Sequence, residues 1–483
     1  MPTNVFELDS DTSSLIYNLL DSSTLRALSN SSRDGFVCVT PWLVRKVNIS
    51  LEQVPAFCHF ALKYDLCADI MNLRLNVGIS RGATYDPILA KVLERAINMT
   101  HFAHLAVNTR RASRRDDVEN PFPFESLPPS LLSLKLVGSL GTGLERLQTM
   151  TKLAHLVLLP PPPAEYNTPR ERAVEAVIRK SACTLESLTL GHALPPSLRT
   201  TDVPTFACKK LHHLCISGTS VSQEQLALMF PNLKSLEIMD DSMIEVLVDQ
   251  TPESSFVLYG ADEHRECPPR MLFPNLQSFC GPHDLALNLS RYHPLCRIVL
   301  NEGTFRATEL SFLSDILLNL TIRSLTLDVR VPGSIVVSGT TFDHILPLAR
   351  HLAFLSLHIG VFEYETCCRL VDCLLQAATF LSPYLQDLRY FRLRLETYNS
   401  TSDICHHNEA PIKLDAIVGA WAAAIPSLRY IELDVDHRKL GHSFWRVSPQ
   451  HGMFLQVSKE EGLSARNWYD TAEWKENHNL SGS

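Results

Sequence analysis

The pattern Leu-x-x-Leu-x-Leu recurs through most of this 483-residue sequence, and it constrains the fold more than any other feature. In one copy the leucines are Leu185, Leu188 and Leu190. The last two alternate as in a short strand with one buried face, and the first lies on the turn that enters the strand. Clear copies begin at Leu131, Leu153, Leu185, Leu211, Leu233, Leu295, Ile322, Leu352, Leu388 and Leu428, and weaker ones at Ile70 and Phe102.

Segments with helical periodicity lie between these strands. They are predicted at residues 85–99, 169–182, 222–230 (capped by Ser222) and 366–380. A unit of one strand and one helix cannot enclose its own core, whereas stacked copies can. The sequence therefore predicts an α/β solenoid, with a curved parallel sheet on its concave side and helices outside.

On these motifs the sequence resembles the leucine-rich-repeat family, over roughly three quarters of its length. Successive copies are about 20 to 40 residues apart, more scattered than the roughly 20 to 29 usual in the family. The Asn or Cys expected three positions after the last strand leucine is also replaced, for example by Ser139 and Ala193. Such irregular repeats resemble those of fungal F-box proteins.

The N-terminal segment is predicted to contain short apolar helices at residues 13–20 and 23–30, the second capped by Ser23. Residues 41–49 then lead into a strand. This segment resembles the F-box, a helical module that docks on the Skp-type adaptor of a cullin ubiquitin ligase. The family's opening Leu-Pro is Leu8-Asp9 here. The residues that match the module, and that the resemblance implies bind the adaptor, are Leu15, Ile16, Leu19, Leu20, Leu25, Leu28, Pro41 and Leu43.

Three parts are expected: an F-box-like helical module at residues 1–50, the repeat solenoid at 51–436, and a C-terminal capping segment and tail at 437–483. Residues 444–458 alternate like a final hairpin, and the end after about residue 477 is expected to fray. The resemblance implies a non-catalytic substrate receptor of a Skp–cullin–F-box ubiquitin ligase. The alternative is a repeat scaffold without a ligase link, whose N-terminal helices only cap the first repeat.

Substrate recognition is predicted on the concave sheet face, at strand positions that alternate with the buried leucines. This face becomes more aromatic and charged in the last three repeats, and aromatic and Arg residues are favoured in binding hot spots. The residues predicted to bind the unknown protein substrate are Phe354, Ser356, His358, Tyr390, Arg392, Arg394, Tyr430, Glu432 and Asp434.

Composition limits the other classes of partner. The net charge of −8 provides no excess of positive charge for binding nucleic acid. No apolar stretch is long enough to predict a membrane-spanning helix, and the acidic N-terminus does not match a secretory signal. The 13 cysteines are an odd number and lie among apolar residues, which predicts reduced thiols in a cytoplasmic or nuclear protein.

One motif suggests catalysis. Gly78-Ile79-Ser80-Arg81-Gly82 has the form of a nucleophile elbow, which makes a serine hydrolase using Ser80 a distant alternative. A Gly-rich turn between strand and helix is also what a repeat unit needs, so no catalytic residue is predicted.

Two groups contain metal-ligand side chains, Cys405-His406-His407 and the nearby Cys367, Cys368 and Cys373. Neither has the ligand spacing of a known metal motif, and thiols on an apolar helix face are usually core residues. No metal site and no cofactor are predicted.

Overall fold

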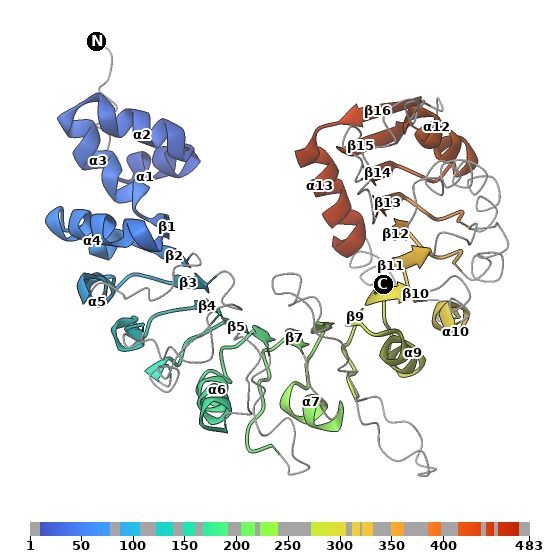
Figure 1. Cartoon of the computed structure of the whole chain (residues 1–483), viewed down its shortest axis with the longest axis horizontal. Helices are drawn as coiled ribbons and strands as arrows, with labels where there is room; N and C mark the ends of the chain where they lie inside the picture. The colour runs from blue at the N-terminus through green and yellow to red at the C-terminus, as the bar shows by residue number, and fades with distance from the viewer. Residues whose placement is uncertain are drawn as a thin grey trace. The chain divides into compact units, whose positions relative to one another are not determined.

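Figure 1 shows the computed structural model of the chain. It divides into two compact units, with residues up to 233 in the first and the described residues from 234 onward in the second. The described residues are 10–77, 87–106, 122–138, 147, 149–159, 168–191, 204–217, 223–239, 272–305, 312–318, 321–331, 349–361, 385–397, 414–435, 441–448 and 453–472.

The first unit begins with helices α1 (Ser10–Leu19), α2 (Ser22–Ser31) and α3 (Arg33–Leu43). They pack around Tyr17, Leu25 and Val39, which are at most 7% exposed. The α2 cap is not Ser23, as the sequence predicted, but Asp21, which accepts a 2.7 Å hydrogen bond from the Thr24 amide. Ser23 lies inside the helix and donates its hydroxyl to Asp21.

The segment predicted as an exit at 41–49 is divided between two elements. Pro41 lies in the last turn of α3, and strand β1 begins at Lys46. Arg45 stacks its guanidinium on the Trp42 ring at 3.3 Å, between the helix and the strand. Helical packing therefore extends further towards the repeats than the proline indicated.

Parallel strands follow in sequence order, each paired with the next. In the first unit these are β1 (Lys46–Ser50), β2 (Asn72–Val77), β3 (His101–Ala106), β4 (Ser133–Val137), β5 (His155–Leu159), β6 (Ser187–Leu190) and β7 (His213–Ser217). The helical elements of this unit are η2 (Leu51–Gln53), α4 (Val54–Lys63), η3 (Cys67–Asp69), α5 (Pro87–Arg95), η4 (Phe124–Ser126), α6 (Thr168–Lys180) and α7 (Gln223–Met229).

In the second unit, strands β9 to β14 are parallel and paired in sequence order, β8 pairs with β9, and β15 and β16 are antiparallel. The strands are β8 (Ser235–Met239), β9 (Ser278–Gly281), β10 (Arg297–Phe305), β11 (Ser324–Val331), β12 (Phe354–Val361), β13 (Tyr390–Thr397), β14 (Tyr430–Val435), β15 (Gly441–Ser448) and β16 (Met453–Val457). The helical elements are α9 (His283–Tyr292), α10 (Phe312–Leu317), α12 (Leu414–Ala424), α13 (Lys459–Asn467) and η11 (Trp468–Ala472).

Two helical layers enclose the sheet of the second unit. Figure 1 shows α9, α10 and α12 on one face of the strands and α13 on the other. Helices on the first of these faces follow their strands in the repeat, as the sequence predicted. The position of α13 was not predicted, and it decides which strand residues are accessible.

The repeat motif accounts for the core of both units. Leu134, Leu136, Leu188 and Leu190 have no exposed surface, and the corresponding residues of later copies are at most 7% exposed. Stacking the units removes these side chains from water, which is the main favourable contribution to folding. The predicted stack of repeat units, with paired parallel strands and inward leucines, is confirmed.

One predicted copy is displaced by three residues. Strand pairing aligns Phe102 with Leu73 and His104 with Leu75, so this copy is Met99, Phe102 and His104, not the copy starting at Phe102. Leu105 faces the other side of the sheet and is half-buried. Burial lowers the pKa of His104 to about 4, because the charged imidazole loses its hydration.

The residue before the first leucine of a copy is often polar, and its side chain donates a hydrogen bond to a backbone carbonyl of the preceding repeat. Thr184 donates to the Leu153 carbonyl at 2.8 Å and Ser427 to the Leu388 carbonyl at 2.8 Å. Ser130, Asn232 and Thr321 make equivalent bonds to the preceding repeat. These side-chain bonds link each turn to the preceding repeat.

The other sequence predictions can be placed in part. The helices predicted at 85–99, 169–182 and 222–230 are α5, α6 and α7, each shorter than predicted. The helix predicted at 366–380, the cap residue Ser222 and the end after 477 lie outside the described residues. No helix in the described part of the chain is long and apolar enough to span a membrane.

We expect Thr184→Val to lower the free energy of unfolding by about 1 kcal/mol, because the Leu153 carbonyl loses its part-buried donor without a change in side-chain volume. Denaturant unfolding would measure this. Thr189→Val, on the accessible face of β6, is the control and should change stability by less than about 0.5 kcal/mol. Equal effects of the two variants would contradict the role of the turn bonds.

We also expect the first unit to lose stability as the pH falls. The unfolded chain binds a proton at His104 near pH 6.5, whereas the folded chain binds it only near pH 4. Stability from this residue is therefore complete above pH 6.5 and is lost between pH 6.5 and 4, by about 2 kcal/mol at pH 5. His104→Leu should remove this part of the pH dependence in urea unfolding, while the two curves run parallel above pH 7.

Candidate interaction surfaces

Helix α1 presents two apolar side chains to solvent. Leu15 is 69% exposed and Leu19 is 86% exposed, although both are large hydrophobic residues in a helix that packs in a core. They are four residues apart, so they lie on the same face, one turn from each other. Leaving both in water has an unfavourable free energy that binding a partner would relieve.

The other residues predicted to bind an adaptor have mixed positions. Leu25 is buried in the three-helix core, and Ile16, Leu20, Leu28 and Leu43 pack partly against it. Pro41 is half-buried in α3. These six residues thus contribute to the packing of the module, whereas Leu15 and Leu19 contribute little to it.

The second surface is the strand face of the second unit that carries α13. We call it the tail-covered face and define it by Arg297, Ser324, Phe354, Ser356, Tyr390, Arg392, Tyr430 and Glu432. Phe354, Ser356, Tyr390 and Glu432 are at most 3% exposed. The prediction that these four residues are accessible is wrong, because all four side chains are buried. The tail contacts Tyr390 through Gly462 and Tyr469, and Glu432 through Arg466.

Asp470 in η11 anchors the tail at one end of this face. Its carboxylate accepts both Nε and Nη2 of Arg297, at 2.8 and 2.9 Å, and the hydroxyl of Ser324 at 2.7 Å. A bidentate arginine–carboxylate pair has defined geometry and is stronger than a neutral hydrogen bond. Both side chains are at most a quarter exposed, so water screens the pair only weakly.

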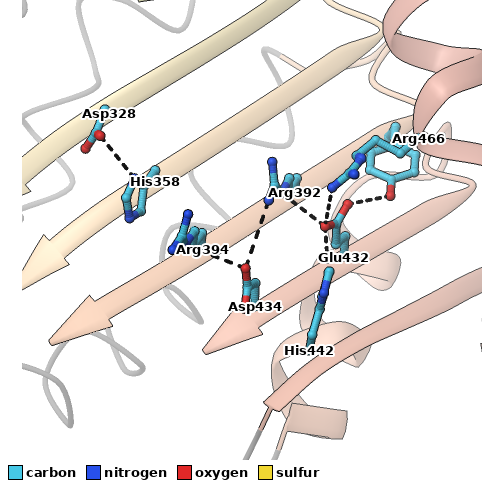
Figure 2. Close-up of polar contacts among 9 residues, drawn as sticks. Asp328, His358, Arg392, Arg394, Glu432, Asp434, His442 and Arg466 are labelled. Carbon is cyan, nitrogen blue, oxygen red and sulfur yellow. Dashed lines mark hydrogen bonds and ion pairs between the residues drawn. The ribbon is translucent and has the colours of Figure 1, made fainter. Parts of the chain in front are cut away.

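Glu432 is the centre of a second anchor (Figure 2). Oε1 lies 3.0 Å from Arg392 Nε, 3.0 Å from Arg466 Nη1 and 2.7 Å from His442 Nε2. The Tyr390 hydroxyl donates to Oε2 at 2.7 Å. The Glu432 side chain is fully buried, and the two guanidinium groups compensate its charge.

This cluster holds the tail against the sheet. Arg466 Nη1 and the Tyr390 hydroxyl donate hydrogen bonds to the Glu432 carboxylate, and Arg392 Nε and His442 Nε2 lie within ion-pair distance of Oε1. Burial raises the pKa of Tyr390, and the charge of Glu432 raises it further, so the phenol remains a hydrogen-bond donor. Arg466 belongs to α13, and the cluster therefore closes only when the helix is docked.

Aromatic rings complete the contact. Tyr390 stacks between Phe354 and Tyr430, with ring centroids 5.2 and 6.2 Å away. Tyr469 of the tail lies over both tyrosines, 6.0 Å from each. Gly462 of α13 fits against Phe444, where a Cβ would come within 2.1 Å of the ring. Only a glycine allows the helix to approach this closely.

Some of the predicted substrate-binding residues stay accessible beside the tail. The Arg394 side chain is 43% exposed and pairs with Asp434 at 3.6 Å. His358 is 3.1 Å from Asp328 on the neighbouring strand (Figure 2). Tyr430 and Arg392 are half-buried. In this unit a partner would meet charged residues that are already paired with each other.

The residues suggested for catalysis or metal binding cannot be placed. Ser80 and its glycines, Cys405-His406-His407, and Cys367, Cys368 and Cys373 all lie outside the described residues. No group that could hold a metal ion occurs in the part that is described. Burial raises the pKa of the Cys208 and Cys280 thiols to about 12, so both thiols are protonated.

Sequence reasoning missed Arg297, Asp470, Arg466 and His442, which hold the tail in place. One sequence signal was available. The tail contains Trp468 and Tyr469 after an apolar hairpin, and large aromatic side chains of this kind are usually at least partly buried. Which strands they cover depends on the turn after β16, which no periodicity specifies.

Comparisons with known proteins add little. No family model matches the sequence, and no curated protein does. Among solved structures, the chain is similar to the leucine-rich-repeat-containing protein LegL7 from Legionella pneumophila, with 13% sequence identity and a TM-score of 0.33, over 82% of this chain and 98% of that one. A likeness at this level adds nothing to the strand order and buried leucines that define the architecture.

We expect Asp470→Ala to loosen the tail and to lower stability by about 2 kcal/mol, because Arg297 keeps its charge in a part-buried place without its partner. Hydrogen exchange of residues 459–472 would report the loosening. Glu461→Gln in the neighbouring helix α13 is the control, because its pair with Arg446 is exposed and should contribute less than about 0.5 kcal/mol. Unchanged exchange in Asp470→Ala would show that the anchor is not needed.

Proposed function

We propose that the chain is a non-catalytic protein-interaction protein, in which the α1–α3 module docks on a Skp-type adaptor of a cullin ubiquitin ligase and the repeats hold a protein substrate. The observation that carries the proposal is the exposed pair Leu15 and Leu19 on α1, in a module that also exposes Val37 of α3, which is 64% exposed. A helical cap needs its apolar residues inward, so an outward pair one turn apart favours a docking role.

The repeats suit the second half of this role. Stacked strands present rows of side chains that differ from repeat to repeat, which gives a long surface for one protein partner. Bringing adaptor and substrate together accelerates ubiquitin transfer by proximity, without reacting groups in the chain itself. The buried, ion-paired Glu432, which contacts Arg466 of the tail, is consistent with a structural use of this polar cluster.

We expect Leu15→Asp with Leu19→Asp to abolish capture of a Skp-type adaptor by the full-length protein, because two carboxylates replace the exposed apolar contact. Co-expression and pull-down would measure capture. Folding should be preserved, since both side chains are largely outside the core.

Ile97→Asp with Leu228→Asp is the matched control, because these residues are 63% and 51% exposed, in the turn after α5 and on α7 of the first unit. This double variant should capture the adaptor normally. If the unmutated protein never captures the adaptor, the chain is a scaffold without a ligase link.

A further inference from the structure

The accessible strand face of the first unit differs in charge from the rest of the chain. Its residues are those of β1–β7 that alternate with the buried positions, and we call it the basic face. It carries the cations Lys46, Arg74 and Lys135 and the imidazoles of His101, His155 and His213, all exposed. None of its residues is acidic, although acidic residues outnumber basic ones 52 to 44 in the whole chain.

The three cations have no carboxylate partner in the part of the chain that the structure describes. Arg74 is held in place by neutral groups instead. Its Nε donates to Asn76 Oδ1 at 3.3 Å, and the Asn76 amide donates to Asn48 Oδ1 at 2.6 Å on the neighbouring strand. A guanidinium oriented in this way loses little freedom when an anion arrives.

Strand register arranges these groups in rows. His101, Ser133, His155, Ser187 and His213 are successive partners across β3 to β7. Lys135 stands two residues after Ser133 on the same side of β4. A carboxylate above Ser133 would therefore lie near the Ser133 hydroxyl and the Lys135 ammonium group. The imidazoles of His101 and His155 would flank it, because they stand on the two adjacent strands, each about 4.8 Å away.

The second unit shows how such a row holds an acidic segment. Arg297 and Ser324 are paired neighbours on adjacent strands, and together they bind the Asp470 carboxylate of the tail. Ser133 and Ser187 occupy the same kind of position on their strands, the first outward place after the turn. In the second unit the chain's own tail occupies this place, whereas no described helix of the first unit lies on the basic face.

On the proposed function as premise, we infer that the basic face binds an acidic, extended segment of the partner protein, with a carboxylate over β4 between Ser133 and Lys135. Val137, Val157 and Leu159 are half-buried beside the cations and would contact apolar side chains of the segment. An extended peptide of about nine residues is long enough to cross the seven strands.

Nucleic acid fits this face less well than an acidic peptide. Three permanent cations neutralise few phosphates, and the net charge of −8 repels a polyanion at long range. The outward residues of β1–β7 include no Phe, Tyr or Trp, so unpaired bases would find only imidazole rings and one guanidinium group to stack on. The half-buried valines and leucine suit a peptide.

The test uses the full-length protein and fluorescent 12-residue peptides, in which Glu alternates with Leu or Val, followed by anisotropy. A peptide with Gln in place of Glu, a single-stranded RNA 12-mer and phosphatidylserine vesicles are the comparison probes. We expect the Glu peptide to bind about tenfold or more tightly than the Gln peptide, and its binding to weaken as NaCl is raised.

Arg74→Glu with Lys135→Glu should weaken binding of the Glu peptide by about tenfold or more. Lys91→Glu with Lys180→Glu makes the same charge change on α5 and α6, at exposed positions outside the face, and should leave affinity unchanged. Ser133→Ala should cause a smaller loss than Lys135→Glu alone.

Three outcomes would overturn the inference. The Glu peptide could bind the two double variants equally, or the protein could bind the Glu and Gln peptides equally. The protein could also bind the RNA or the vesicles more tightly than the Glu peptide. The outcome is separate from that of the proposed function. Arg74→Glu with Lys135→Glu should still capture the Skp-type adaptor, and loss of adaptor capture by Leu15→Asp with Leu19→Asp should leave peptide binding intact.

Discussion

The structure depends on one constraint, which is that no single repeat can bury its own leucines. Each strand contributes two inward apolar side chains and a turn contributes a third, and these are removed from water only by the strands on either side. Backbone pairing in sequence order and the side-chain bonds from Thr184 and Ser427 act between neighbours as well. Stability is therefore local, and both ends of such an array need protection.

The two ends are protected differently. At the start, α1–α3 form a separate small core, joined to β1 through the stacking of Arg45 on Trp42. At the end, the chain reverses direction, because β15 and β16 are antiparallel to β14 and to each other. The reversal also directs α13 across the sheet, and so the end cap covers one face of the second unit as well.

Electrostatics then distinguishes the strand faces of the two units. On the tail-covered face, charged residues are internally paired around Glu432 and Asp470, with burial that makes the pairs costly to break. On the basic face, the cations of β1, β2 and β4 have no carboxylate partner among the described residues, and Arg74 donates to the neutral Asn76. These cations are held by the sheet at fixed spacing, and such an arrangement favours a partner with negative charges.

The sequence by itself determined the repeat, the alternation of strand and helix, and which leucines are buried. The three leucines of each copy are spaced by three and two residues, and in a stacked array this spacing places all three towards the core. The sequence misplaced the copy at Phe102, since a buried His104 in a leucine position breaks the pattern while satisfying the packing. Only the tertiary structure decided which outward residues are accessible. Tyr390 and Glu432 alternate correctly and yet are buried, because contacts 72 and 34 residues apart in sequence, to Gly462 and Arg466, depend on where the tail folds back. Periodicity carries no information on such contacts.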